Sequence, residues 1–409
     1  MLNIIWIFFF MSAFITALFK LIFLGDQLIF GEIMTALFAM SKTAFEISIG
    51  LTGVLALWLG IMQIGERSGF IALLTRGLTP LFGKLMPDIP ANHPALGAMV
   101  MNISANALGL DNAATPLGIK AMQELQSLNP NKETASNAQI LFLVINTSAV
   151  TLFPVTIFTY RAQMGATHPT DVFIPILLAT YFSTLCGLLA VAWVQKINLL
   201  DKTILAYLSG FTAFVASIIV YFSQLNQADM LFQSALISNL ILFSLIIVFI
   251  SSAAYQKIDA YEAFIVGAKE GFQTAIGIIP YLVAMLVAIG VFRASGALDL
   301  LMDGLRYAVN LAHLDPRFID AMPTALMKPF SGSGARAMMV DTMQTYGADS
   351  FAGRLSSIVQ GSTETTFYVL AVYFGSVGIK NIRHALACGL IADFAGIIAA
   401  IFIAYWFFS

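Results

Sequence analysis

The chain has 409 residues, of which 59% are apolar and 10% are charged, whereas soluble proteins carry roughly 25% charged residues. This composition and a mean hydropathy of +0.87 indicate an integral membrane protein. A net charge of -2 gives no sign of a nucleic-acid surface. The polar connections are too short for a soluble domain, so any function must be carried within or at the bilayer.

Apolar runs long enough to cross the membrane recur along the whole chain. A helix needs roughly 20 apolar residues to span the hydrocarbon core. By this measure the sequence predicts nine spans, at residues 2–23, 45–64, 138–160, 172–195, 203–223, 230–255, 272–292, 355–378 and 384–408. No basic segment precedes the first run, so we interpret it as a retained helix and not as a signal peptide.

Two regions between the predicted spans are too polar to cross the membrane cleanly. The first is predicted to hold an amphipathic surface helix and then two half-length helices, at residues 69–85, 94–108 and 113–125. The second has the same order, at residues 297–312, 317–330 and 335–346. Since non-helical backbone at membrane depth must be satisfied by protein or water, we expect the breaks near 106–112 and 329–334 to face a cavity.

Residues 42–78 align with residues 269–305 without a gap, with 12 of 37 positions identical. The sequence therefore predicts an all-α polytopic membrane protein built from two repeats with re-entrant or broken half helices. If the half helices re-enter, an odd number of spans separates the copies and the repeats are inverted, which is the arrangement we favour. If each pair instead forms one broken span, the repeats are parallel.

Basic residues in the connections bear on orientation. With inverted repeats, one side of the membrane carries six of them and the other carries Lys20, Lys42 and Arg161; the six are Lys196, Lys202, Lys257, Lys269, Lys380 and Arg383. The positive-inside rule then predicts a cytoplasmic N-terminus and a multi-pass protein of the bacterial plasma (inner) membrane.

The first polar break is the first candidate for a solute site. Asn102 and Asn106 lie one helical turn apart, and Asp111 or Asn112 can cap the next helix after a turn. A helix start of this kind presents free N–H groups to an anion or a polar oxygen. The candidate binding residues are Asn102, Ser104, Asn106, Asp111, Asn112 and Thr115. Alternatively, these side chains only cap and cross-link packed helices.

Hydroxyl and amide residues within two predicted spans form a second candidate group. Ser148 matches Ser362, and Thr151 matches Thr365, at an offset of 214 residues. The candidate binding residues are Asn146, Ser148 and Thr151 in the first copy and Gln360, Ser362 and Thr363 in the second. Small hydroxyl residues also hold membrane helices together, so these alone are weak indicators of a site.

Two carboxylates fall within predicted spans. Glu364 and Asp393 each lie about ten residues into an apolar run, where a charged carboxylate costs roughly 2.5 kcal/mol or more and marks a candidate functional site. We interpret both as residues that couple transport to a proton or a cation. The alternatives are a salt bridge from Glu364 to Lys328 or Arg336, and a helix kink capped by Asp393.

The second polar break combines glycines with two cations. Lys328 and Arg336 flank Ser331 and Ser333 in a Gly-rich turn that lacks the spacing of a phosphate-binding loop, which argues against ATP-driven pumping. We interpret Ser331 and Ser333 as binding residues and the two cations as gating or anion-attracting residues. The alternative is a tight corner with snorkelling side chains. We expect no metal site and no cofactor, because the four histidines form no ligand pair.

Long motifs in the two halves carry a family resemblance. The first half, with His93-Pro-Ala-Leu-Gly-Ala-Met and Asn102-Ile-Ser-Ala-Asn106, resembles the spore maturation protein A family. The second, with Lys328-Pro-Phe-Ser-Gly-Ser-Gly and Gln360-Gly-Ser-Thr-Glu-Thr-Thr, resembles the spore maturation protein B family. The resemblance implies two Gate (nucleoside-recognition) halves, residues 1–200 and 201–409, and a relation to concentrative nucleoside transporters and to the membrane part of ferrous iron transport protein B.

These features predict a secondary transporter of a small polar or anionic solute, such as a nucleoside or a carboxylate, coupled to a proton or sodium. The expected partners are the solute and the lipid bilayer, without nucleic acid. A homodimer is left open, because the Gly- and Ala-rich face at residues 50–60 suits internal packing equally well. We expect no enzymatic activity. The alternative is a non-transporting component of envelope or spore-type maturation, or a lipid-acting protein, which an apolar groove open to lipid would favour over an enclosed aqueous cavity.

Overall fold

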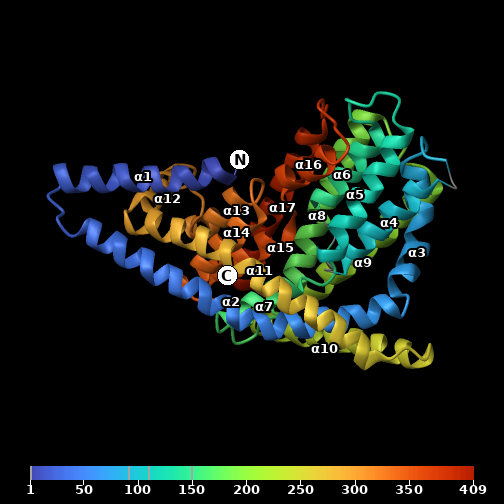
Figure 1. Ribbon diagram of the computed structural model, residues 1–409, viewed down its shortest axis with the longest axis horizontal. Helices are drawn as coiled ribbons and strands as arrows, with labels where there is room; N and C mark the ends of the chain where they lie inside the picture. The colour runs from blue at the N-terminus through green and yellow to red at the C-terminus, as the bar shows by residue number, and fades with distance from the viewer. Residues whose placement is uncertain (1, 91–92, 109–110, 149–150) are drawn as a thin grey trace.

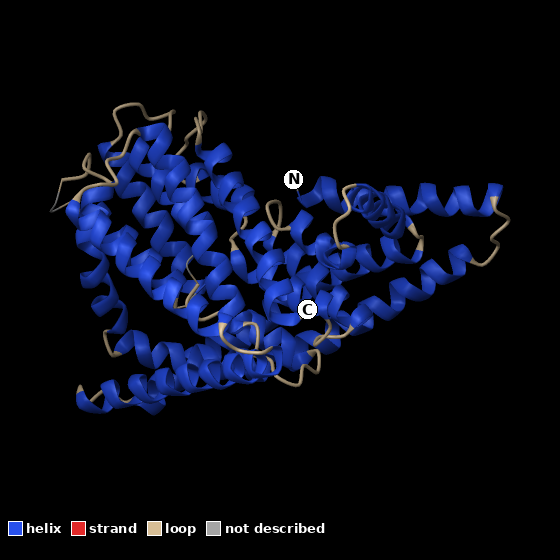
Figure 2. Ribbon diagram, turned by 180° about the vertical axis from the view of Figure 1, so that it is seen from behind, coloured by secondary structure: helices blue, strands red, loops and turns tan. Residues whose placement is uncertain are grey.

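The computed structural model describes residues 2–90, 93–108, 111–148 and 151–409, without the side chains of residues 2 and 111–113. Regular structure in these ranges is helical (Figures 1 and 2). In chain order the elements are α1 (Leu2–Phe23), α2 (Ile29–Arg67), α3 (Phe70–Leu85), α4 (Pro94–Ala107), α5 (Asp111–Leu128), α6 (Asn137–Ser148), α7 (Val155–Gln163), α8 (Phe173–Gln195), α9 (Lys202–Ser223), α10 (Gln227–Tyr255), α11 (Ala260–Ala294), α12 (Ala297–Leu311), η1 (Pro316–Ala321), α13 (Met322–Met327), α14 (Gly332–Tyr346), α15 (Phe351–Ser362), α16 (Thr366–Gly375) and α17 (Ala385–Phe408).

Seven of the described helices are long and apolar enough to cross a membrane. They are Asn3–Phe23, Ile29–Arg67, Phe173–Gln195, Lys202–Ser223, Gln227–Tyr255, Ala260–Ala294 and Ala385–Phe408. Each helix either contains one of the spans predicted from hydropathy or matches it to within one residue. The predicted all-α polytopic membrane fold is therefore confirmed.

The other two predicted spans were wrong as continuous helices. The run at 138–160 divides into α6 and α7, and the run at 355–378 divides into α15 and α16, of 12 and 10 residues. At 1.5 Å of rise per residue, neither half can cross a 30 Å core alone. A hydropathy window averages across the few polar residues at each break, so the pattern predicted one helix where there are two.

The repeat is visible in the order of the elements. α1 to α8 correspond to α10 to α17, and α9 lies between them. Both copies end their long second helix at a Ser-Gly pair in which the glycine is left-handed: φ is 73° at Gly69 and 82° at Gly296. A side chain is strained in this conformation, so glycine allows the same sharp turn into α3 and into α12.

Equivalent helices of the two copies pack antiparallel, which makes the repeats inverted. Along α2 and α11, Gly290 lies beside Met40 and Gly271 beside Ala56, so the numbering rises on one helix as it falls on the other. The neighbouring helices α8 and α17 (Figure 1) are also antiparallel, because Gly187 lies beside Ala392 and Ser183 beside Gly396. A two-fold axis that reverses spanning helices lies in the membrane plane, as in inverted-repeat transporters.

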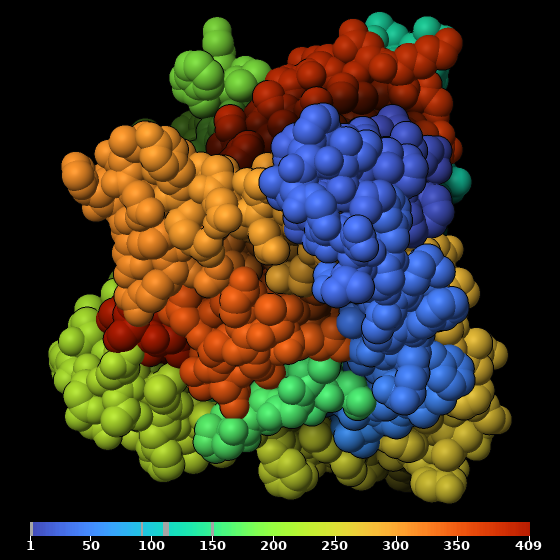
Figure 3. Space-filling model, turned by 90° about the vertical axis from the view of Figure 1, so that its left-hand side faces the viewer, coloured from blue at the N-terminus to red at the C-terminus, as the bar shows by residue number. Residues whose placement is uncertain are grey.

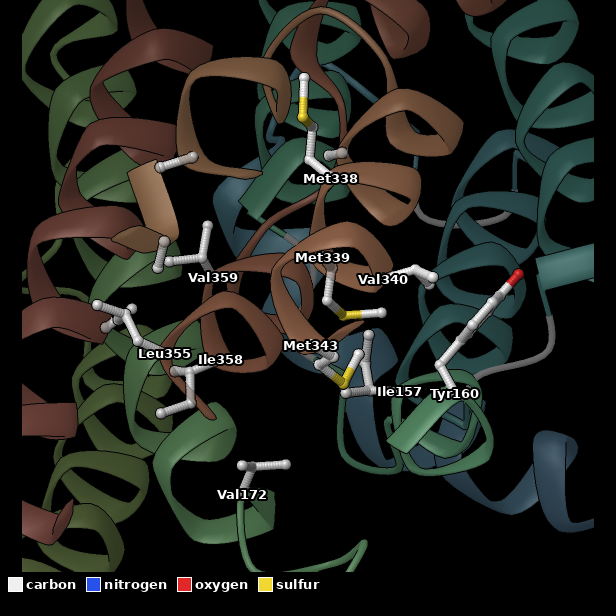
Figure 4. Packing of buried hydrophobic residues seen from close by; sticks show 14 of the residues in the cluster. Ile157, Tyr160, Val172, Met338, Met339, Val340, Met343, Leu355, Ile358 and Val359 are labelled. Atoms are coloured by element: carbon white, nitrogen blue, oxygen red, sulfur yellow. The ribbon is translucent and has the colours of Figure 1, made fainter. Parts of the chain in front are cut away.

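The half helices re-enter, as the inverted arrangement requires. α4 and α5 pack side by side as a hairpin, and the Asn102 side chain on α4 donates a hydrogen bond of 2.7 Å to the carbonyl of Ala114 on α5. α13 and α14 form the second hairpin. In Figure 4, Met339 and Met343 of α14 lie close to Ile157 of α7, so this arm of the hairpin packs within the hydrophobic core.

The helix between the repeats, α9, packs on the first one. The Tyr207 hydroxyl donates to the carbonyl of Gly77 on α3 at 2.5 Å, and Thr212 lies 2.8 Å from the Tyr181 hydroxyl on α8. Dividing the chain between Leu225 and Asn226 therefore gives two pieces, each a complete repeat, with α9 kept on the first. Because α2 contacts α11 and α8 contacts α17 extensively, we expect the two pieces to copurify when coexpressed and to be degraded when expressed singly. Stable accumulation of either piece alone would contradict this prediction.

Candidate functional site

Four discontinuities of the backbone meet at one place between the repeats. Two are the hairpin tips after α4 and α13, and two are the breaks between α6 and α7 and between α15 and α16. The Leu152 N–H donates to the carbonyl of Ala107 at 2.9 Å, and at the equivalent place Phe367 N–H donates to Pro329 at 3.1 Å. Each break is therefore fastened to the hairpin tip of its own repeat.

A third backbone bond joins the two copies. The Glu364 N–H, in the break of the second repeat, donates to the carbonyl of Thr147 near the end of α6 at 2.7 Å. Gly389 on α17 permits this approach, because a Cβ there would lie 2.9 Å from a Thr366 side-chain carbon. These bonds satisfy backbone groups that a broken helix leaves unpaired.

Amides from the first repeat form a chain across the site. Asn106 on α4 donates to the Asn146 side-chain oxygen on α6 at 2.8 Å, and Asn146 donates to the carbonyl of Phe142 at 2.9 Å. Asn102 also lies 3.3 Å from the Tyr373 hydroxyl on α16. The structure thus brings three predicted residues into one region, and one of them, Asn102, contacts the second repeat.

In the second repeat, Lys328 and Gln360 hold the other hairpin tip. The Lys328 ammonium donates to the Gln360 backbone carbonyl at 2.8 Å, and the Gln360 side-chain amide lies 3.4 Å from the carbonyl of Gly332. Ser331 caps α14 by accepting the Gly334 N–H at 3.0 Å, and its oxygen lies 3.3 Å from that of Ser333. The Gly-rich turn therefore leads directly into the positive end of the α14 dipole.

Asp393 lies within α17, which is continuous from Ala385 to Phe408. Its carboxylate accepts a hydrogen bond of 2.6 Å from the Thr366 hydroxyl at the start of α16. Thr363 also lies close to α17, because a Cβ on Gly396 would overlap its methyl carbon. Asp393 therefore fixes the second break against α17.

Glu364 lies half-buried within the break itself and not inside a continuous helix as predicted. Its carboxylate makes no hydrogen bond or ion pair with any residue that the structure describes. The alternative salt bridges to Lys328 and Arg336 do not form, since Lys328 contacts Gln360 and the Arg336 guanidinium lies 5.6 Å above the Tyr160 ring. A carboxylate at a helix break is available to a proton or a cation.

The remaining predicted residues occupy the same region with local roles. The Ser148 and Ser362 hydroxyls donate to carbonyls three residues earlier in their own helices. Thr151 is half-buried in the first break, and Thr115 is half-buried on α5 without a hydrogen bond among the described residues. The side chains of Asp111 and Asn112 lie outside the described part of the chain.

Several buried polar atoms of the site have no hydrogen-bond partner within the described residues. They are Asn102 Oδ1, Ser104 Oγ, Thr147 Oγ1, Gln360 Oε1 and Thr365 Oγ1. Native proteins pair nearly all such atoms, so a group of them calls for a ligand, an ion or ordered water. The described part of the chain holds no cluster of metal-ligating side chains.

Sequence reasoning missed Thr147, Thr365, Thr366 and Tyr373 as site residues. Thr365 lies beside Gly332, where a Cβ would come within 3.0 Å of its hydroxyl. The match of Thr365 with Thr151 at the repeat offset was the one signal that could have found a missed residue. Tyr373 meets a partner 271 positions away, and no local pattern reveals such a contact.

Inverted repeats, re-entrant hairpins and broken helices around one polar centre define a polytopic membrane protein of the class that includes secondary transporters. The sequence profile of the Gate family, described as nucleoside recognition, matches residues 48–164 and 275–380. The match covers more than half of the chain, so the chain belongs to this family.

Two curated relatives each resemble about a third of the chain. Spore maturation protein B of Bacillus subtilis (strain 168) is 52% identical over 148 residues, which are 36% of this chain and 82% of that protein. Spore maturation protein A of the same organism is 46% identical over 152 residues, which are 37% of this chain and 78% of that protein. The predicted resemblance to both families is confirmed.

Proposed function

We propose that the protein is a secondary transporter of the bacterial inner membrane, with a cytoplasmic N-terminus, that moves a small polar or anionic solute. The observation that carries this is the meeting of two hairpin tips and two helix breaks at one polar centre on the inverted-repeat axis. In transporters of this construction the solute binds at the repeat interface, between half-helix ends. The unpaired buried atoms supply donors and acceptors for it.

The two repeats contribute differently to the proposed site. The first offers neutral amides at Asn102, Asn106 and Asn146, which can recognise carbonyl and hydroxyl groups. The second offers the Lys328 ammonium and the start of α14, which favour negative charge. The family description, nucleoside recognition, agrees with a heterocycle carrying hydroxyl groups, and carboxylates fit the charged side equally well.

Glu364 is the proposed coupling residue. It lies at the break, belongs to no ion pair among the described residues, and its backbone N–H joins the two repeats. Binding of a proton or sodium to Glu364 would change the charge beside the backbone hydrogen bond that joins the two repeats. We propose transport and not catalysis for this site.

Replacing Glu364 with Gln tests this proposal. Nucleosides, dicarboxylates and sodium are first screened for thermal stabilisation of the purified protein. The stabilising compound is then followed into proteoliposomes with and without a proton or sodium gradient. We expect gradient-driven uptake to fall about tenfold or more in Glu364→Gln, since coupling between two ligands typically amounts to 1–3 kcal/mol.

The matched control is Glu46→Gln, which removes an exposed carboxylate paired only with Lys42 at 3.6 Å on the outer surface of α2. It should transport like the wild type. Full gradient-driven uptake by Glu364→Gln would overturn the assignment of the coupling residue. Equal loss in both variants would indicate that the assay measures folding and not coupling.

One observation favours a second candidate, a component of envelope or spore-type maturation that handles lipid. A cavity of about 500 Å³ lies among α8, α9 and α10, and its lining is almost wholly apolar. Phe153, Leu177 and Phe214 contribute to it, and an apolar cavity of this kind excludes water. The absence of uptake by the wild type, together with copurified lipid, would favour this candidate.

A further inference from the structure

The site lies between two contacts that join the repeats at opposite ends of the molecule. The α6–α7 segment begins directly after residues 129–136 and ends directly before residues 164–172. The α15–α16 segment begins directly after residues 347–350 and ends directly before residues 376–384. The two broken segments therefore run in opposite directions between the same pair of contacts.

The first contact, here named the Arg161 end, joins residues 164–172 to residues 347–350 (Figure 3). Arg161, at the end of α7, donates to the Asp171 carboxylate at 2.9 Å, to Asp349 at 3.2 Å and to the Ala348 carbonyl at 2.8 Å. Arg354 donates to the second oxygen of Asp171 at 2.8 Å. Two cations and two carboxylates thus neutralise one another across the repeats.

Each ion pair that crosses the repeats in this network has one buried partner. The Arg161 side chain is 0% exposed against 31% for Asp349, and the Asp171 side chain is 2% exposed against 18% for Arg354. Burial raises the pKa of Asp349, but hydrogen bonds from Thr167 and the charges of Arg354 and Arg161 outweigh it, so the pKa lies below its ordinary value. Opening this end would separate the buried Arg161 and Asp171 side chains from their partners on the second repeat, and an ion pair with a buried member resists such separation more strongly than an exposed one.

The second contact, here named the Lys380 end, joins residues 129–136 to residues 376–384. Asn381 and Lys380 donate their N–H groups to the carbonyl of Glu133 at 2.9 Å, and Ala135 N–H donates to Asn381 at 2.9 Å. The Lys380 ammonium contacts the Glu133 carboxylate at 2.6 Å, but these side chains are 75% and 66% exposed. Water can replace each of these bonds as the contact opens.

From this difference we infer that the two ends of the site are unequal gates: the Lys380 end opens to admit the solute, and the Arg161 end stays closed while it does so. The inference rests on the proposed transport function and adds the direction from which the site is reached. Alternating access in inverted repeats moves one half against the other. The two repeats should therefore separate first at the end where water most readily replaces the hydrogen bonds between them.

A disulfide across the Lys380 end tests the inference without measuring transport. Thr134 and Asn381 are paired in an isolated bridge, and bridge partners lie within about 5.5 Å, a separation that a disulfide accepts. The variant carries Thr134→Cys and Asn381→Cys in the full chain. Hydrogen exchange is then followed at the site amides of Leu152, Glu364 and Phe367, which donate to backbone carbonyls.

We expect the disulfide to slow exchange at these site amides by about tenfold or more, and reduction to restore the wild-type rate, because opening is what exposes them to water. The reduced form of the same variant controls for folding, and Thr134→Cys alone controls for the substitution. Unchanged exchange in the oxidised form would overturn the inference, since water would then reach the site from the Arg161 end. Slowed hydrogen exchange in a protein that takes up no solute would support the unequal opening of the two ends and contradict the transport proposal.

Discussion

Replacing Gly271 with Ala should strain the packing of the two repeats and lower both the stability and the yield of folded protein. A Cβ at this position on α11 would lie 2.6 Å from the Ala56 Cα and 2.6 Å from the Leu55 carbonyl oxygen on α2. Both are backbone atoms, so no side-chain rotation relieves the overlap. Overpacking typically costs 1–3 kcal/mol, and we expect a loss of about 3 kcal/mol, measured as a lower Tm of the purified protein in detergent.

The matched control lies on the same helix. A Cβ added to Gly277 meets nothing within 4 Å, so Gly277→Ala should leave the Tm unchanged or raise it, because alanine favours a helix by about 1 kcal/mol over glycine. If Gly271→Ala and Gly277→Ala behave alike, the close crossing of α2 and α11 does not determine the fold.

The sequence predicted the features of the fold that depend on local chemistry. The matching Ser-Gly turns at Gly69 and Gly296 could be predicted because the repeat preserves them and glycine alone makes the turn easy. Apolar length predicted the seven long helices. The direction of the repeats followed from counting spans, and the antiparallel crossing of α2 and α11 supplied the confirmation.

The breaks in α6–α7 and α15–α16 were missed because apolar length outweighed local signals. Pro154 disfavours a continuous helix in the first run, and residues 363–365 are all polar in the second, but hydropathy averages over both. What the sequence could not reveal is how the broken backbone is satisfied. Its partners are distant: Glu364 N–H donates to the Thr147 carbonyl, and Leu152 N–H donates to the Ala107 carbonyl.

The candidate site was predicted in composition but not in connectivity. Asn102 and Asn106 were selected because they lie one turn apart beside a polar break, and Asn146 because it is polar within a predicted span; the structure places all three at the site. The pairing of Thr366 with Asp393 requires α16 to start beside the middle of α17. Only the packing of the two repeats sets that position, so the sequence could not predict a hydrogen bond between a hydroxyl and a carboxylate that lie 27 residues apart.

Replacing Arg161 with Met should destabilise the protein far more than replacing Lys380 with Met, although each change removes one cation from a contact between the repeats. Arg161→Met leaves Asp349 and the carbonyls of Ala348 and Pro169 without the guanidinium that binds all three. Removing one partner of a buried ion pair costs about 3–5 kcal/mol. An exposed pair such as Lys380 with Glu133 contributes about 0–1 kcal/mol.

Thermal unfolding of both variants in the same detergent measures the difference, and the exposed Lys380→Met serves as the control for loss of charge. The expected order follows from the surroundings of the carboxylate that loses its cation: Glu133 is exposed to water, whereas Asp171 is 2% exposed and stays inside the protein. Equal shifts in Tm would mean that water already reaches the Arg161 network. In that case the two ends would be equivalent, and the inverted repeats would open with equal ease toward either side of the membrane.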